Sequence, residues 1–191
     1  MATYKEINGT DITVVSSDPS NPVTGEVWYN TTTQKLKGYQ QVLSNAWSTG
    51  GNLNTARAGI TGAGIQTAAL AFGGSDPTGS TIYGNTEKYD GSSWTEVNDM
   101  NTARTNMGRS GTQTSALAFG SGPPGAGTVL NESFNGTNWT EVADMNTARR
   151  SLAGAGDNNT EALAFGGWSP PDYYANTESW NGSSWTEVND L

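Results

Sequence analysis

The sequence contains neither cysteine nor histidine among its 191 residues. Without cysteine there are no disulfides and no thiolate chemistry, and without histidine the commonest general base and metal ligand is missing. Basic side chains are scarce too: nine lysines and arginines stand against eighteen aspartates and glutamates, a net charge of -9. This charge opposes binding to a phosphate backbone. We therefore expect no metal, no cofactor and no nucleic-acid partner.

Long apolar runs and helical periodicity are missing as well. No apolar stretch approaches the roughly 18 to 20 residues of a membrane span, and the opening MATYKEINGTDITVV has no basic region followed by an apolar core. We expect no membrane insertion and no ordinary export signal. Twenty-five glycines interrupt every segment, and no window keeps apolar residues at helical spacing. The sequence therefore predicts an all-β fold.

A repeat of about 46 residues dominates the rest of the chain. The motif NTAR begins at Asn54, Asn101 and Asn146, and each copy continues through ALAF to a closing WTEV. The tryptophans Trp94, Trp139 and Trp185 mark this period, and Trp47 lies one period earlier, before the first NTAR motif. A unit of this length is too short for a domain, so it must bury its apolar surface against copies of itself.

Each repeat reads as four antiparallel strands. A glycine-rich segment, such as 105–112, suits a strand in a place where backbones approach closely. The apolar ALAF segment predicts a strand buried on both faces, and a glycine doublet allows positive φ where it ends. Asp-Gly or Asn-Gly then separates two aromatic residues, as in Tyr89 to Trp94, which indicates a tight hairpin with φ above zero at both central positions. We expect the two aromatic rings to pack together.

This order of features resembles the Kelch repeat. A methionine, Met100 or Met145, precedes the arginine by four residues, and an apolar strand, a glycine doublet and an aromatic before tryptophan follow. The spacing from aromatic to tryptophan is shorter than in Kelch repeats, and the second copy has Gly120-Ser121 at the doublet. The resemblance covers 53–191. It implies a Kelch-like β-propeller of four-stranded antiparallel blades, with clear blades at about 53–97, 98–142 and 143–191.

Residues 1–50 lack the NTAR and ALAF motifs that recur in residues 51–191. Segments 25–29, 35–39 and 45–48 can be read as strands two to four of a degenerate first blade, with 11–16 as its inner strand. Four blades would then close a ring. The alternative is a β-hairpin attachment segment beside a propeller whose open edges are covered by further blades or by an assembly, since an uncovered edge strand invites aggregation.

The opening also resembles the N-terminal segments of tail fibres and other virion structural proteins of bacteriophages, particularly marine ones. The residues that carry this resemblance are GEVWYNTT at 25–32, followed by a polar turn and the strand LKG. The resemblance implies localisation in the virion and attachment to other virion proteins through residues 1–50.

The same charged residues recur in every copy of the repeat, which indicates that they serve the structure of the repeat and not a single site. We expect structural roles for the arginines Arg57, Arg104 and Arg149, each with a partner among the recurring acids, and for the repeat tryptophans. A catalytic site is a single asymmetric set of groups, and no such set stands out. We expect no enzymatic activity.

The loop after the glycine doublet varies between copies, at 75–84, 122–130 and 168–175. These loops leave their sheets on the same side as the links between blades, and rigid scaffolds commonly carry binding residues on such loops. The candidate binding residues are Tyr83, Trp168, Asp172, Tyr173 and Tyr174. Aromatic rings beside an acid suit stacking on a sugar or contact with a protein; filling gaps between loops is the alternative for these aromatics.

Three functions follow from these features. The first is a non-enzymatic phage virion protein, a tail fibre or appendage, that displays loops for recognition of a host-surface glycan or protein. The second is a glycan-binding or glycan-degrading propeller, with Asp76 or Asp172 paired with a repeat acid. The third is a cellular Kelch-type interaction module. We also expect a homo-oligomer or a place in a larger assembly, which would cover the open edges.

Overall fold

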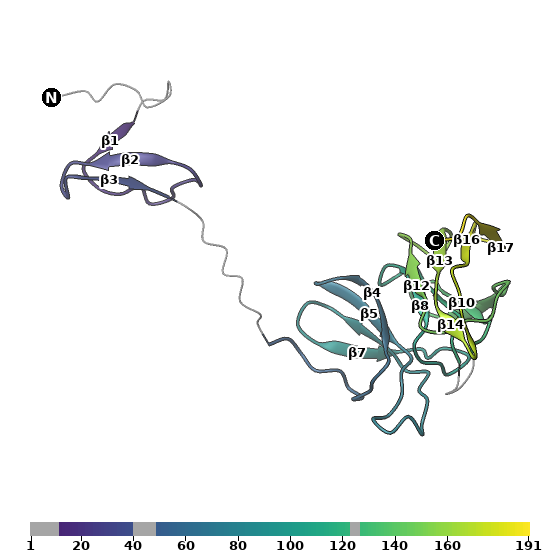
Figure 1. Cartoon of the computed structure of the whole chain (residues 1–191). Coiled ribbons are helices and arrows are strands. Elements are labelled where there is room, and N and C mark those ends of the chain that lie inside the picture. Colours follow the sequence, from purple (N-terminus) through teal and green to yellow (C-terminus); the bar gives the residue numbers. More distant parts are fainter. Residues whose placement is uncertain (1–11, 40–48, 123–126) are drawn as a thin grey trace. The chain divides into compact units, whose positions relative to one another are not determined.

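The computed structural model of the chain describes residues 12–39, 49–122 and 127–191. The chain divides into two compact units, Met1–Ser48 and Thr49–Leu191, which are described separately (Figure 1). All regular structure in the described residues is β-strand, so the predicted all-β class is confirmed. None of the described residues belongs to a helix that could cross a membrane.

The first unit contains a three-stranded sheet of β1 (Thr13–Val15), β2 (Val27–Asn30) and β3 (Lys35–Gly38). Strands β2 and β3 form an antiparallel hairpin, whereas β1 pairs with β2 in parallel, Thr13 opposite Trp28. The inner strand of an antiparallel blade would run the other way, so β1 does not have the pairing expected of a degenerate first blade. The strand expected at 45–48, with Trp47, lies outside the described residues.

Asp18 holds this small sheet together. Its carboxylate accepts hydrogen bonds from Lys37 Nζ at 2.6 Å, Trp28 Nε1 at 3.0 Å and Asn30 Nδ2 at 2.8 Å. The bond from Lys37, followed by those from Trp28 and Asn30, lowers the pKa of Asp18 to about 2. One ionised carboxylate therefore connects the loop after β1 to both strands of the hairpin.

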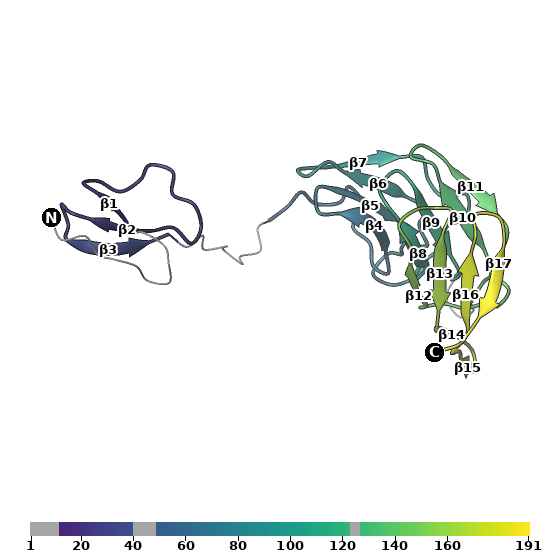
Figure 2. The same ribbon diagram turned by 90° about the horizontal axis from the view of Figure 1, so that it is seen from above.

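The second unit consists of three four-stranded antiparallel sheets, one for each repeat (Figure 2). The first sheet comprises β4 (Thr61–Ile65), β5 (Ala68–Phe72), β6 (Thr86–Tyr89) and β7 (Trp94–Val97). The second comprises β8 (Gly108–Gly111), β9 (Ala116–Phe119), β10 (Asn131–Phe134) and β11 (Trp139–Val142). The third comprises β12 (Ala153–Ala155), β13 (Ala162–Phe165), β16 (Thr177–Trp180) and β17 (Trp185–Val188). A two-stranded hairpin, β14 (Trp168–Ser169) with β15 (Asp172–Tyr173), is inserted into the third repeat.

Two apolar cores lie between successive sheets. In the first, Leu70 and Phe72 of β5 meet Ala116 and Ala118 of β9 together with Trp139. The second core repeats this arrangement one sheet further along, between Leu117 and Phe119 on one side and Ala162, Ala164 and Trp185 on the other. The second sheet thus packs its Ala-Trp face on the preceding repeat and its Leu-Phe face on the following one. Burial of these side chains drives the stacking of the repeats.

The glycine-rich first strands occupy the crowded place that the sequence predicts. Strands β4, β8 and β12 contact one another in that order. A Cβ atom added to Gly154 of β12 would overlap the backbone of Arg109 in β8 and the ring of Phe119. Larger residues are therefore excluded where these inner strands meet.

The hairpin turns between the third and fourth strands differ from the prediction. Tyr89 pairs with Trp94, which leaves a four-residue loop instead of a two-residue one, and only its glycine, Gly91, has positive φ, at 97°. The Asp90 carboxylate accepts hydrogen bonds from the backbone N–H groups of Ser92 and Ser93, both at 2.8 Å. The side-chain acceptor replaces the second positive φ. These bonds, that from Ser93 foremost, lower the pKa of Asp90.

The prediction that ALAF is buried on both faces is confirmed for β5 and β9 and wrong for β13. Leu70 and Leu117 are fully buried, but Leu163 is 41% exposed. The difference has a simple cause, because the described residues of the second unit form no further four-stranded sheet to stack on the Leu-Phe face of the third sheet.

Candidate functional site

The recurring arginines and glutamates meet inside each repeat. In the second repeat Arg104 Nη2 lies 2.9 Å from Glu132 Oε1, and Nη1 donates to the carbonyls of Gly120 at 3.0 Å and Leu130 at 2.8 Å. Glu132 also accepts the backbone N–H of Asn101 at 2.7 Å. The arginine and the carboxylate thereby fasten the NTAR segment to the sheet that follows it.

The same pair recurs in the other repeats with one variation. Arg149 Nη2 lies 2.8 Å from Glu178 Oε1, as in the second repeat. Arg57 Nη1 lies 3.0 Å from Glu87 Oε1 without hydrogen-bond alignment. Burial lowers the pKa of Arg104, and the charge of Glu132 opposes that effect. The partners expected for these arginines are thus found among the recurring acids.

Other repeat acids accept hydrogen bonds from residues at the start of the neighbouring strand in their own repeat. Glu187 Oε1 accepts Asn176 Nδ2 at 2.6 Å, Glu96 accepts Asn85, and Asp99 Oδ1 accepts the N–H of Thr86 at 3.3 Å. The residues that the structure describes include no group of three acids placed to hold a metal ion. The geometry of the recurring acids is that of structural hydrogen bonding.

The repeat tryptophans pack between sheets. Trp139 lies 4.9 Å from Phe72 of the preceding sheet, and Trp185 lies 5.0 Å from Phe119, measured between ring centroids. Trp94, the tryptophan of the first repeat, stacks on Tyr89 at 5.0 Å. The expected pairing of the two hairpin aromatics is confirmed by this contact and by those of the other repeats.

The variable loops lie where the links between repeats leave the sheets. The N–H of Met100, after β7, donates to Gly84 O at 2.9 Å, and the N–H of Met145 donates to Val129 O at the same distance. Leu191 donates likewise to Ala175 O at 3.2 Å. The loops and links therefore share one end of their sheets, as predicted. Residues 123–126 of the second loop lie outside the described residues.

The third loop forms the β14–β15 hairpin. Trp168 pairs with Tyr173 across it, with ring centroids 6.1 Å apart, and a cis Pro170-Pro171 peptide forms its tip. Tyr173 is 87% exposed and Asp172 is also exposed. Trp168 and Tyr174 are half-buried. Four of the five candidate binding residues thus come together on one short hairpin.

Arg150 supports this hairpin, and the sequence reading missed it. Its guanidinium lies 4.1 Å from the centroid of the Trp168 ring, a cation–π contact. The backbones of the two residues exchange hydrogen bonds at 2.9 and 3.0 Å. The available signal was a doubled arginine, Arg149-Arg150, where the first two copies of the motif have one.

Tyr83 and Asp76 belong to the corresponding loop of the first repeat. No hydrogen bond or ring contact among the described residues joins Tyr83 to the third-repeat hairpin. Asp76 accepts hydrogen bonds from Thr81 N at 3.1 Å, Thr78 Oγ1 at 2.8 Å and Ser80 Oγ at 2.9 Å. The bonds, led by that from Thr81, lower the pKa of Asp76. An ionised carboxylate within its own loop suits turn formation better than acid catalysis.

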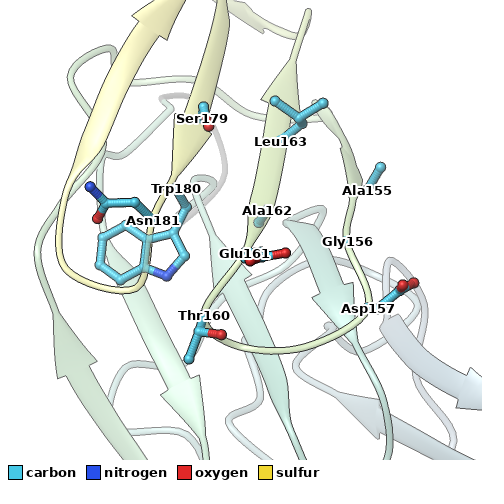
Figure 3. Close-up of a pocket in the computed structure, with 10 residues that line it drawn as sticks. All are labelled: Ala155, Gly156, Asp157, Thr160, Glu161, Ala162, Leu163, Ser179, Trp180 and Asn181. Atoms are coloured by element: carbon cyan, nitrogen blue, oxygen red, sulfur yellow. The ribbon is translucent and has the colours of Figure 1, made fainter.

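An open depression of about 600 Å³ lies on the third sheet. Figure 3 shows its lining, which comes from β12, β13, β16 and the turns at their ends. Leu163 and Ser179 form part of its floor, and Thr160, Trp180 and Asn181 lie at the turn end. No local sequence pattern predicts this depression, because it exists only where a sheet face has no neighbouring sheet.

In comparisons with known proteins, no protein-family model matches the chain, and no curated protein has a significantly similar sequence.

Proposed function

We propose that the chain is a non-enzymatic structural protein of a bacteriophage virion, a tail fibre or appendage, built as a Kelch-like β-propeller that recognises a host surface. The three four-stranded sheets would be its blades. Support comes from their face-to-face stacking in chain order, with glycine-rich strands where the sheets approach most closely. Most of the segment 1–50 belongs to a separate compact unit, Met1–Ser48, which suits attachment to other virion proteins.

The observation that carries the recognition role is the β14–β15 hairpin. It presents the exposed Tyr173 beside Asp172, on a base formed by Trp168 and Arg150. An aromatic face next to an acceptor carboxylate suits a sugar ring, which offers C–H groups to one and hydroxyl groups to the other. The neighbouring prolines restrict the backbone, which lowers the ordering cost of binding. A host-surface glycan is the ligand class that this chemistry favours, and a surface protein is the alternative.

The test is binding of the full chain to a panel of bacterial surface polysaccharides. We expect Tyr173→Ala and Asp172→Asn to weaken binding by about tenfold or more, because anchor residues carry most of a small interface's energy. Tyr39→Ala, an exposed tyrosine in the first unit, is the matched control and should leave affinity unchanged. Equal binding by all variants would overturn the assignment of the hairpin, and release of reducing ends would overturn the non-enzymatic role.

A further inference from the structure

Within the described residues of the second unit, the two outer faces of the three-sheet stack have no neighbouring sheet against them, unlike the inner faces. On the Leu-Phe face of the third sheet, Leu163 is 41% and Val188 42% exposed, whereas their counterparts in the first two repeats are buried or packed on a core. On the Ala-Trp face of the first sheet, Ile60 is 40% exposed, whereas Met107 and Leu152 at the same repeat position are each 6% exposed. Each uncovered face matches one half of the internal interfaces.

One buried hydroxyl of the third sheet also differs from its counterpart in the first sheet. Trp139 Nε1 of the second repeat donates to the buried Thr86 Oγ1 of the first, at 2.9 Å. The counterpart of Thr86 in the third repeat is Thr177, whose Oγ1 is buried and has no hydrogen-bond partner in the described structure. A hydroxyl oxygen in this setting is an acceptor that lacks its donor. At the first internal interface the donor is the indole of Trp139, whose counterpart on the outer face of the first sheet is Trp94; at the second interface Trp185 makes no such bond.

The depression on the third sheet, called the socket below, corresponds to a place that a side chain of the next repeat fills in the first two repeats. In the first repeat this place receives Gln113 from the next repeat, whose Nε2 donates to Ala69 O at 3.1 Å and Tyr89 O at 2.5 Å. In the second it receives Asn159, which donates to Ser133 Oγ at 2.9 Å and Phe134 O at 3.2 Å. The third repeat has the socket, shown in Figure 3, and no described residue in it. Gln66, the corresponding residue of the first repeat, is exposed.

A ladder of backbone hydrogen bonds also stops at these ends. The N–H of Asn106 donates to Gly59 O, and the N–H of Ser151 donates to Asn106 O, both at 3.0 Å. The ladder adds one step for each repeat along the stack. Its next step would be an N–H at the position of Gly59 donating to Ser151 O.

From these observations we propose that two copies of this chain associate head to tail, so that the Leu-Phe face of the third sheet in each copy receives the Ala-Trp face of the first sheet in the other. Trp94 of one copy packs on Phe165 of the other and donates to Thr177 Oγ1. Gln66 enters the socket and donates to Ala162 O and Trp180 O. Ile60 covers the apolar surface near Phe165.

The occupant is a second copy because the covering surface must carry a tryptophan, an amide and an apolar residue at the spacing of the repeat. The first sheet of this chain carries all three, at Trp94, Gln66 and Ile60. Residues 49–52 run close to the edge of that face, where Gly50 lies near the Tyr89 hydroxyl, and they leave Ile60 exposed. Unlike faces that meet head to tail generate either a closed ring or a filament.

Closure after two copies gives six sheets, a number within the four to eight blades of closed propellers, whereas three copies would give nine. This count rests on the propeller proposed above; the pairing of faces rests on the internal contacts alone. The recognition hairpin is measured by a separate binding experiment, so failure of the ring and failure of the recognition role are distinguishable.

The first experiment is mass determination in solution, by light scattering after size exclusion, of the full chain at tens of micromolar. We expect 40.0 kDa, twice the chain mass of 20.0 kDa. Leu163→Asp should give the 20.0 kDa species, or raise the dissociation constant at least about tenfold, because it buries an unpaired charge. Val23→Asp, at a valine that is 67% exposed in the first unit, is the control and should remain at 40.0 kDa. A monomeric parent protein would overturn the proposal.

Cysteine cross-linking tests the register, and the absence of native cysteine makes it unambiguous. Asn98 Nδ2 lies 2.6 Å from Asn138 Oδ1 across the first internal interface, and the corresponding residues at the outer faces are Asn189 and Ser93. A mixture of Asn189→Cys and Ser93→Cys proteins should form a disulfide-linked dimer under mild oxidation, and neither variant alone should. The doubly substituted Asn98→Cys, Asn138→Cys protein is the positive control for an internal bond. Cross-linking of one variant with itself, or a ladder of larger species from a chain carrying both outer cysteines, would overturn the two-copy ring.

Discussion

Arg104 and Glu132 form an ion pair inside the second repeat, 2.9 Å apart and with both side chains closed to solvent. The arginine also binds two backbone carbonyls, and the carboxylate binds the N–H groups of Asn101 and Thr102. Desolvation of two charges is costly, and these additional hydrogen bonds offset that cost. The pair therefore fixes the position of a link segment rather than serving catalysis.

Replacement of one member should be strongly destabilising. We expect Arg104→Met to reduce the free energy of unfolding by about 3–5 kcal/mol, because Glu132 would remain buried as an unpaired charge. Urea unfolding of the second unit measures this. Arg109→Met, at an exposed arginine of β8, is the control and should cost less than about 0.5 kcal/mol. Similar losses in the two variants would contradict a special role for the buried pair.

Substitution of the repeat tryptophans should separate the hydrogen bond from the ring. Trp139→Phe and Trp185→Phe remove the same volume, but only Trp139 Nε1 has a hydrogen-bond partner, Thr86, among the described residues. We expect Trp139→Phe to be the more destabilising by about 1–3 kcal/mol, since it leaves a buried acceptor unsatisfied. Thermal and urea unfolding give the difference directly. Equal losses would assign the contribution to packing alone.

The inner strands should not tolerate an added methyl group. In Gly154→Ala the new carbon would overlap the Arg109 backbone, so we expect a loss of about 1–3 kcal/mol from overpacking. Ala153→Ser, which adds one atom at the neighbouring exposed position of β12, should be close to neutral. A neutral Gly154→Ala would mean that the strands can separate at no cost.

The first unit should respond to acid through Asp18. Its pKa in the folded state, about 2, lies below the ordinary value of 3.8, so its stabilising effect is complete above about pH 4 and is lost as the pH falls through about 2. The indole N–H signal of Trp28, followed by nuclear magnetic resonance, should shift with a midpoint near pH 2. A midpoint near pH 4 would contradict the three-bond arrangement. Asp18→Asn should remove the transition.

Local sequence signals predicted the strands well. The run from Ala116 to Phe119 is apolar, short and bounded by glycine, and it forms a buried strand as expected. Positive φ was predicted for the glycine doublet that follows the ALAF strand. It is found even in the second repeat, where Ser121 replaces the second glycine and adopts φ of 53°. These features depend on a few adjacent residues, which is why the sequence alone could identify them.

Features that depend on distant contacts were less accessible. Three families of acids recur in the repeats, and only the fold selects the one represented by Glu132 as the partner of the arginine. The stacking of Arg150 on Trp168 joins residues on either side of a whole hairpin. The hairpin turn at Asp90 was predicted with the wrong length. The Asp90 carboxylate accepts the N–H groups of Ser92 and Ser93, and this stabilises a longer turn with a single residue at positive φ. The socket on the third sheet follows from what is not packed there, which no local pattern records.

The bonds around Glu132 have a consequence for how such a chain grows. Asn101, Thr102 and Arg104 lie in the same copy of the repeat as the carboxylate that binds them. A tandem duplication of the coding segment that starts at the NTAR motif would therefore carry each anchor together with its receptor. Each added copy would bring the groups that fix its own NTAR segment, whereas the loops after the glycine doublet contribute no side chain to this anchor.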